Sequence, residues 1–202
     1  MKKMKNADWF RMLALAPLAL TAFVLPAPPA QAAEQVSPVA ASHSAYTYRS
    51  AWDCGNKAVM VGVMANEKPN ISALGAICRE IRANGNLGKR INRPVRGNMR
   101  YETTKDFLCP KGEVIAGIGM YSRINLQGLS IYCKKWYAAK RLVTGDYTTD
   151  IRVGQYITKN AVEFRCSGQE YMVKAFRTGR DRKNFGSITG FANFRTVCDV
   201  HN

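Results

Sequence analysis

The sequence predicts an all-β domain made of three disulfide-closed repeats of about 55 residues. Three observations predict it: six cysteines at regular intervals, apolar runs with a period of two, and turn residues between those runs. The units 54–78 and 109–133 have the same length and align without a gap, and the first cysteines of successive units are 55 and then 57 residues apart. A period of this size is typical of a repeated supersecondary unit.

The apolar runs have the alternation of strands. Val59, Val61 and Val63 alternate with other residues at a period of two, which indicates a strand rather than a helix. Gly62 and Gly117 hold matching positions in these runs. A glycine inside a strand suits a β-bulge or a close approach of another backbone, so we expect one of these at both positions.

The third unit, 166–198, is eight residues longer than the other two. We expect Tyr171, Val173 and Ala175 to share one apolar face, with Lys174 in the place of the glycine. The extra length falls in the loop 177–186.

The cysteine count predicts three disulfides in an oxidising compartment. Six cysteines allow many pairings, and a bridge between repeats stays open at this point. If each unit closes locally, the bridges are Cys54–Cys78, Cys109–Cys133 and Cys166–Cys198. A zinc site would need closely spaced Cys or His ligands, and the chain has no CxxC and only His43 and His201.

Residues 1–32 have the features of a signal peptide. A basic start precedes the apolar run Met12–Leu25, and Ala30-Gln31-Ala32 forms a cleavage signal. The run has 14 residues, fewer than the roughly 20 that span a bilayer, so we expect a secreted or periplasmic protein and not an integral membrane protein. Residues 33–44, rich in Ala, Ser and Pro, predict a flexible linker before a single domain, 45–202.

The N-terminal part of the domain is expected to close the ring of repeats. Residues 45–53 match the ends of the segments between units, whereas only 199–202 follow the third unit. We therefore expect 45–53 to pair beside the third unit, which would hide sheet edges.

The net charge is +16, and removing the leader, with its four basic residues and one acidic residue, would leave about +13. An exported protein of this charge fits an anionic glycan or an envelope polymer as its partner, rather than a nucleic acid. A protein partner and a generally basic soluble protein are the alternatives.

One candidate binding stretch is Lys134-Lys135-Trp136-Tyr137. Aromatic faces stack on sugar rings, and lysine or arginine can hold carboxylate, sulfate or phosphate groups. Trp136 also stands in the register of Ile81, so the alternative is a core residue.

Further basic residues gather in two other stretches. The third unit contributes the candidates Arg177, Arg180 and Arg182, with Lys183 beside them. The segment after the first unit contributes Lys89, Arg90, Arg93, Arg96 and Arg100. Solvated surface is the alternative for each group.

Catalytic chemistry has little support in the sequence, and we expect no enzyme, cofactor or metal. Nucleophilic catalysis with a histidine base needs a histidine, and none lies between residues 45 and 200. Glycoside cleavage would need a pair of carboxylates. The candidates are Asp53, Asp106, Asp146, Asp150, Asp181, Glu113, Glu163 and Glu170, which show no motif spacing.

The second unit carries a resemblance to a known family. Cys109-Pro110-Lys111-Gly112, Gly117, the run Gly128–Ile131 and Cys133 resemble the vitelline-membrane outer-layer family, and dermatopontin-like proteins are the second resemblance. The resemblance covers about 46–200 and implies a β-prism of three sheets with pseudo-threefold symmetry, with glycan binding as the habit of that fold. The acidic stretch expected before the family's Asn-Gly is absent, and 124–127 stand in its place.

Overall fold

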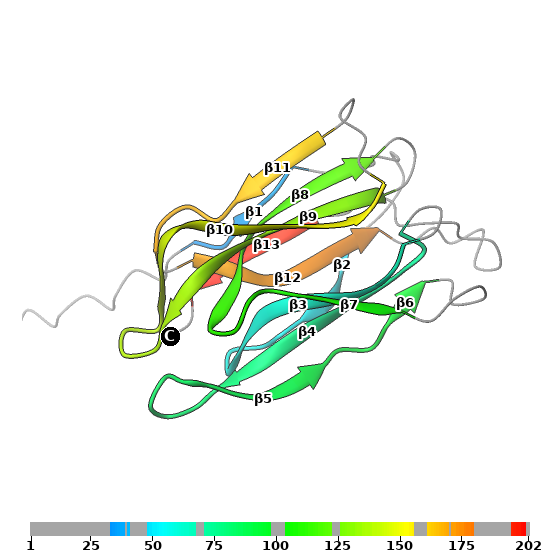
Figure 1. Ribbon diagram of the computed structural model, residues 1–202. Helices are drawn as coiled ribbons and strands as arrows, with labels where there is room; N and C mark the ends of the chain where they lie inside the picture. Colours follow the sequence, from blue (N-terminus) through cyan, green and yellow to red (C-terminus); the bar gives the residue numbers. More distant parts are fainter. Residues whose placement is uncertain are drawn as a thin grey trace, which may run out of the picture. The chain divides into compact units, whose positions relative to one another are not determined.

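The computed structural model describes residues 33–38, 40, 48–67, 71–97, 104–122, 126–155, 161–169, 171–179 and 195–200. The chain divides into two units, Met1–Gln31 and Ala32–Asn202, and every described residue belongs to the second. All elements among these residues are β-strands in three antiparallel sheets (Figure 1). The described segments include no helix long and apolar enough to cross a bilayer.

Each sheet has four strands along its main path. The first sheet has the order β5 (Leu87–Asn92), β4 (Ala73–Ile81), β3 (Ala58–Asn66) and β7 (Lys105–Leu108), with β6 (Arg96–Gly97) also paired to β4. The second has the order β10 (Leu142–Gly154), β9 (Leu126–Tyr137), β8 (Glu113–Ser122) and β11 (Ala161–Arg165). The third has the order β1 (Gln35–Val36), β13 (Arg195–Val200), β12 (Tyr171–Gly179) and β2 (Tyr48–Asp53).

The sheets are joined by exchanged edge strands. The two central strands of each sheet come from one cysteine unit, and one edge strand comes from the segment that precedes the next unit's first cysteine. Thus β7 pairs with β3, and β11 pairs with β8. The N-terminal β2 pairs with β12 in the same way, so the predicted closure of the ring is confirmed for Tyr48–Asp53.

A bulge recurs at one position in all three sheets. One residue is left out of the pairing between the central strands in each repeat, and its carbonyl accepts a bond from the first cysteine of the next repeat. The N–H···O bonds run from Cys109 to Val61 (2.9 Å), from Cys166 to Ala116 (2.9 Å) and from Cys54 to Lys174 (3.1 Å). The expected bulge beside Gly62 and Gly117 is confirmed, and the same bond links the three repeats in a ring.

The expected register of the third unit is wrong by one residue. Val173 pairs with Cys198 as Met60 pairs with Cys78, so Lys174 is the bulge residue and Ala175 holds the glycine position. The cause is one extra residue in the turn that leads from Cys166 into β12. A methyl group is therefore accommodated in the third sheet where the other two have glycine.

The three sheets share one main core, and the predicted local disulfides are confirmed. The bridges are Cys54–Cys78, Cys109–Cys133 and Cys166–Cys198. The buried cluster takes large side chains from every sheet, including Met60, Ile118 and Phe176. Burial of such side chains contributes about 1.5–3 kcal/mol each.

Part of the stretch 33–44, for which a flexible linker is expected, pairs with the third sheet as β1 (Gln35–Val36). Gln35 pairs with Cys198 and Val36 with Val197, which is the register that Ile91 and Asn92 of β5 have on β4. The Gln35 side chain also bonds the backbone N–H (2.8 Å) and carbonyl (3.0 Å) of Ser167. The free edge of β13 offers unpaired backbone groups, and this segment satisfies them despite its loop-like composition.

Candidate binding groove on the first repeat

The stretch Lys134–Tyr137 lies on β9, so its side chains alternate between two faces. The Trp136 indole N–H donates to the Gly85 carbonyl at 2.8 Å, and its ring packs against a buried cluster. Trp136 therefore has the role of a core residue, the alternative to a binding role. Lys135 and Tyr137 are exposed. The four residues therefore form no continuous patch, and their role in binding stays a prediction.

Several of the other basic candidates bond within the protein. Arg177 makes a two-oxygen contact with the Glu34 carboxylate (2.6 and 2.9 Å), and Arg93 donates to the Cys54 carbonyl at 2.7 Å. Arg90 pairs with Asp106 at 2.6 Å. Arg180, Arg182, Lys183 and Arg100 lie outside the described residues.

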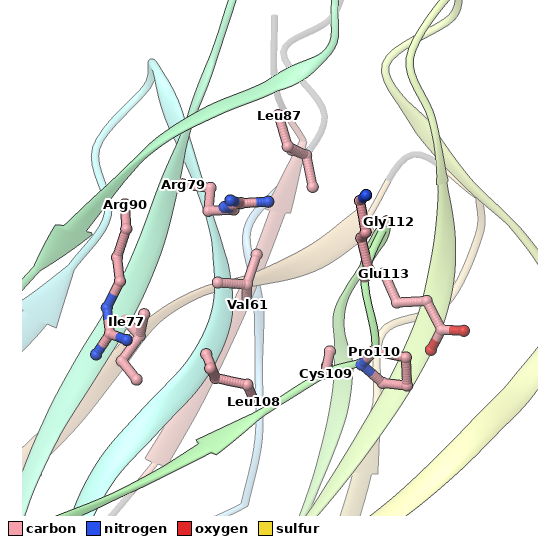
Figure 2. A pocket seen from close by; sticks show the side chains of 11 residues that line it. Val61, Ile77, Arg79, Leu87, Arg90, Leu108, Cys109, Pro110, Gly112 and Glu113 are labelled. Atoms are coloured by element: carbon pink, nitrogen blue, oxygen red, sulfur yellow. The ribbon is translucent and has the colours of Figure 1, made fainter.

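A groove of about 350 Å³ lies on the first sheet beside the turn that opens the second repeat (Figure 2). Its apolar lining consists of Val61, Ile77, Leu87 and Leu108, and the turn 109–113 forms one wall. Neighbouring side chains of a strand point to opposite faces of the sheet, and Ala76 and Cys78 face the main core. Ile77, which lies between them, and the other apolar side chains of the groove point away from that core. Leu108 is 42% exposed, an unusual degree for leucine.

Two cations at the groove have no partner within the described part of the chain. Arg79 extends from β4 toward the Gly112 wall, above Val61 (Figure 2), and Lys111 stands on the turn. Neither side chain makes a hydrogen bond or ion pair with a described residue. The nearby carboxylate of Glu113 accepts a hydrogen bond from the Thr148 hydroxyl. The groove therefore combines an apolar floor with two cations that form no ion pair with a described residue, and with one carboxylate, Glu113, in its wall.

The equivalent position of the second repeat is filled by the side chain of Tyr147. Its ring meets the Tyr132 ring edge-on, with centroids 5.9 Å apart, and its hydroxyl donates to the Ala116 carbonyl at 3.4 Å. Lys134 lies 4.5 Å and Arg165 4.8 Å from its centroid. Cations near the face of an aromatic ring are attracted by its quadrupole.

The strand registers relate these two positions residue by residue. Ile77 lies opposite Gly62 as Tyr132 lies opposite Gly117. The corresponding pairs are Val61 and Ala116, Ile77 and Tyr132, Arg79 and Lys134, and Leu108 and Arg165. All four members from the first repeat line the groove, and all four members from the second contact Tyr147.

Tyr147 itself has no counterpart in the first repeat. Between the matching pairs Trp136–Val143 and Cys133–Thr149, β10 has five residues, 144–148. Between the corresponding pairs of the first sheet, Ile81–Leu87 and Cys78–Ile91, β5 has only three residues, 88–90. These two additional residues carry the ring that closes the position. The net difference in cysteine spacing, 57 against 55, includes them together with one more residue in the turn before β10 and one fewer between Thr149 and Cys166.

In the third repeat an ion pair closes the same position. The bulge residue Lys174 bonds Asp199 at 2.6 Å, and their side chains are only 15% and 21% exposed. Val197 is as fully buried as Ile77, to which it corresponds. The groove described above lies at this position of the first repeat.

The two tyrosines of the second repeat are held in the neutral form. Burial, followed by a hydrogen bond with Glu163, raises the pKa of Tyr132 above 10.0. Burial also raises the pKa of Tyr147, and this outweighs the opposite effect of Arg165. Both phenols therefore keep their protons and can donate hydrogen bonds.

Three of the carboxylates considered for acid–base chemistry are engaged in ion pairs. Asp106, Asp150 and Glu163 each form an ion pair with an arginine. No group of three or more His, Cys, Asp or Glu side chains in the described part of the chain is placed to hold a metal ion.

Comparison with known proteins gives a result at the level of the fold. The sequence matches no protein-family model and no curated protein. A Malaysian banana lectin structure is similar over 83% of this chain and 99% of its own, with a TM-score of 0.50 and 12% identity. The fold is a β-prism. The fold class predicted from the sequence is therefore confirmed.

Two other lectin structures are similar at a lower score. A mannose-binding jacalin-related lectin from Ananas comosus has a TM-score of 0.48 and 10% identity, covering 83% of this chain and 98% of its own. A prostate-specific WGA16 glycoprotein lectin has a TM-score of 0.48 and 10% identity, covering 83% and 100%. At such identities the similarity concerns the fold alone.

Proposed function

We propose that this protein is a non-catalytic glycan-binding β-prism, exported by the N-terminal leader, which binds an anionic or cell-envelope saccharide in the groove of the first repeat. The observation that supports it is the pair Arg79 and Lys111, which form no ion pair with a described residue and lie beside an apolar floor. The lectin structures with this fold support the binding class. Membership of the vitelline-membrane outer-layer family, predicted from the second unit, belongs to the same proposal.

Charge and size favour a small acidic sugar. Arginine holds carboxylate, sulfate or phosphate oxygens in two-point hydrogen bonds, and lysine adds a mobile positive charge. The volume of about 350 Å³ is near the lower end of small-molecule sites, which run from about 300 to 1,000 Å³. The groove therefore suits one sugar residue of a polymer.

A protein partner is the second candidate, and the exposure of Leu108 is the observation that favours it. An apolar side chain of a partner could cover this leucine, and exposed apolar surface next to charge is typical of interaction sites.

The test is a glycan array with neutral, carboxylated and sulfated polymers at low and at physiological salt. We expect retention of acidic polymers, and roughly tenfold weaker retention for Arg79→Gln and for Lys111→Gln, since each removes a charge-assisted bond. Lys89→Gln is the matched control, because Lys89 is an exposed cation of β5 that does not line the groove.

Two outcomes would contradict the proposal. One is that no glycan is retained at either salt concentration, in which case a saturable protein partner in a pull-down would favour the second candidate. The other is an equal loss for Lys89→Gln and Arg79→Gln, which would indicate general attraction to a basic protein.

A further inference from the structure

We infer that the groove of the first repeat takes a low-molecular-weight phenolic acid, with its ring in the place that Tyr147 fills in the second repeat. The inference goes beyond the glycan proposal and does not depend on it. It rests on the internal symmetry of the chain, in which one repeat displays the group that its neighbour lacks.

The first step is the surroundings of Tyr147. Four groups define its position: a carbonyl at its hydroxyl (Ala116, 3.4 Å), a ring at its edge (Tyr132, centroids 5.9 Å apart), and two cations near its ring. This arrangement is specific for a phenol, because it uses both the hydroxyl and the π-system of the ring.

The second step is that the first repeat keeps two of these four groups, the backbone carbonyl and one cation, and has aliphatic side chains in place of the other two. Val61 and Ile77 stand in place of Ala116 and Tyr132, and Arg79 stands in place of Lys134. Because β5 lacks the two additional residues, it has no counterpart of Tyr147; its Leu87 and Arg90 line the groove, which stays open (Figure 2).

The third step is a hydrogen-bond acceptor at the inner end of the groove. The Ala116 carbonyl accepts two bonds, one from the Cys166 N–H (2.9 Å) and one from the Tyr147 hydroxyl. The Val61 carbonyl accepts the equivalent N–H bond from Cys109, also at 2.9 Å. Its second lone pair corresponds to the one that the Tyr147 hydroxyl uses, so it is placed to accept a bond from a phenol.

The fourth step concerns the walls and the charge. Leu108 replaces Arg165, and with Leu87 it gives the ring aliphatic contacts. Arg79 supplies the cation near the ring, and Lys111 at the rim is free to bind an anionic substituent. A pyranose fits this inner end less well, since it has no π-system and would bury hydroxyls that lack partners there.

The experiment is calorimetric titration of the full chain with 4-hydroxyphenylacetate. We expect saturable binding, and about fivefold weaker binding of 4-methylphenylacetate, which lacks the hydroxyl, and of p-cresol, which lacks the carboxylate. Arg79→Met is expected to weaken 4-hydroxyphenylacetate about tenfold, whereas Lys89→Met should leave it unchanged. Leu108→Trp, at an exposed position, should block the groove.

A second measurement uses the other repeat. Tyr147→Ala is expected to lower the melting temperature, and p-cresol should raise it again by filling the vacated position. Ile151→Ala on the same strand is the matched control, because Ile151 packs against the main core and its loss leaves no phenol-shaped site. Its melting temperature should respond to p-cresol only as far as that of the wild type, in which the groove of the first repeat is also present, and less than that of Tyr147→Ala.

The failures of the two proposals can be told apart. Binding of glucuronate without binding of 4-hydroxyphenylacetate would overturn this inference and leave the glycan proposal intact. Binding of the phenolic acid with no glycan retained would do the opposite. Equal affinities for 4-hydroxyphenylacetate and 4-methylphenylacetate would also overturn it, since the Val61 carbonyl would then have no part in recognition.

Discussion

The first and second repeats have the same backbone plan and differ in what occupies one position of it. Both have a disulfide across 24 residues, a bulge before a glycine and an edge strand from the next repeat. In the second repeat the position beside the bulge holds Tyr147, and in the first it is a groove. The comparison shows that the β-prism framework leaves this position free to vary, so the length of the adjacent strand and the side chains of each repeat decide what occupies it.

The third repeat extends the comparison. It fills the same position with the Lys174–Asp199 ion pair, and it borrows β1 as well as β2 from the N-terminal part of the chain. An apolar groove, an aromatic ring between cations and an ion pair are thus three solutions on one framework.

The largest difference between the first two repeats is expected at their bulge glycines. A Cβ at Gly62 would lie 2.4 Å from the Phe107 carbonyl oxygen, whereas a Cβ at Gly117 would lie 3.1 Å from that of Phe164. We expect Gly62→Ala to destabilise the protein by about 2–3 kcal/mol and Gly117→Ala by about 1 kcal/mol or less. Urea unfolding of both variants measures this.

The third repeat supplies the control for that prediction, because Ala175 already occupies the matching position. Ala175→Gly should change stability only through backbone entropy and one lost methyl group, by about 1 kcal/mol. Equal losses for Gly62→Ala and Gly117→Ala would show that the two bulges are closer in shape than the structure indicates.

A smaller effect is expected where the third repeat borrows its edge strand. Gln35→Ala removes two side-chain bonds to the backbone of Ser167 and should cost about 1 kcal/mol. Hydrogen exchange of the Thr196 amide, which is bonded to the buried Ser37 hydroxyl, should become faster at the same time. Gln127→Ala, in the second sheet, serves as the comparison and should leave that exchange unchanged.

The smallest effect is confined to alkaline pH and to the second repeat. The folded protein raises the pKa of Tyr132 and Tyr147 above 10.0, so it holds these protons more tightly than the unfolded chain. Stability should therefore be unaffected by these groups below pH 10 and should fall as the pH rises above it. Denaturant titrations of the wild type and of Tyr147→Phe measure the difference, and the variant should lose less stability over this range.

An alkaline loss of the same size in Tyr147→Phe and in Tyr132→Phe as in the wild type would remove the second repeat as its source. The first repeat offers no counterpart, because Ile77 stands where Tyr132 does and does not titrate.

The architecture could be predicted because its signals are local. Equal spacing of Cys54, Cys78, Cys109 and Cys133 gave both the period and the bridges, and the alternation of apolar residues gave the strands. The register of the third unit was wrong because a single additional turn residue after Cys166 cannot be seen in a pattern that tolerates small shifts.

The groove could not be predicted in the same way. Val61, Ile77, Arg79 and Leu108 come from three strands and resemble ordinary strand residues in sequence. The available signals were comparative: the spacing of 57 against 55 residues, and Leu108 where the next repeat has Arg165. Trp136 and Arg177 were predicted as binding residues from their residue types, although each is held by a hydrogen bond within the protein.

The edge strands of the third sheet have a consequence for how the molecule assembles. Among the described strands, β1 and β2 are synthesised first, whereas their partners β13 and β12 are synthesised last. Gln35 can therefore pair only after Cys198 has been made. Contacts between residues this far apart in the sequence form slowly, and an incomplete chain leaves strand edges unpaired. The ring is therefore completed only after Arg195–Val200 has been made, because the earliest and the latest of the described strands meet at its junction.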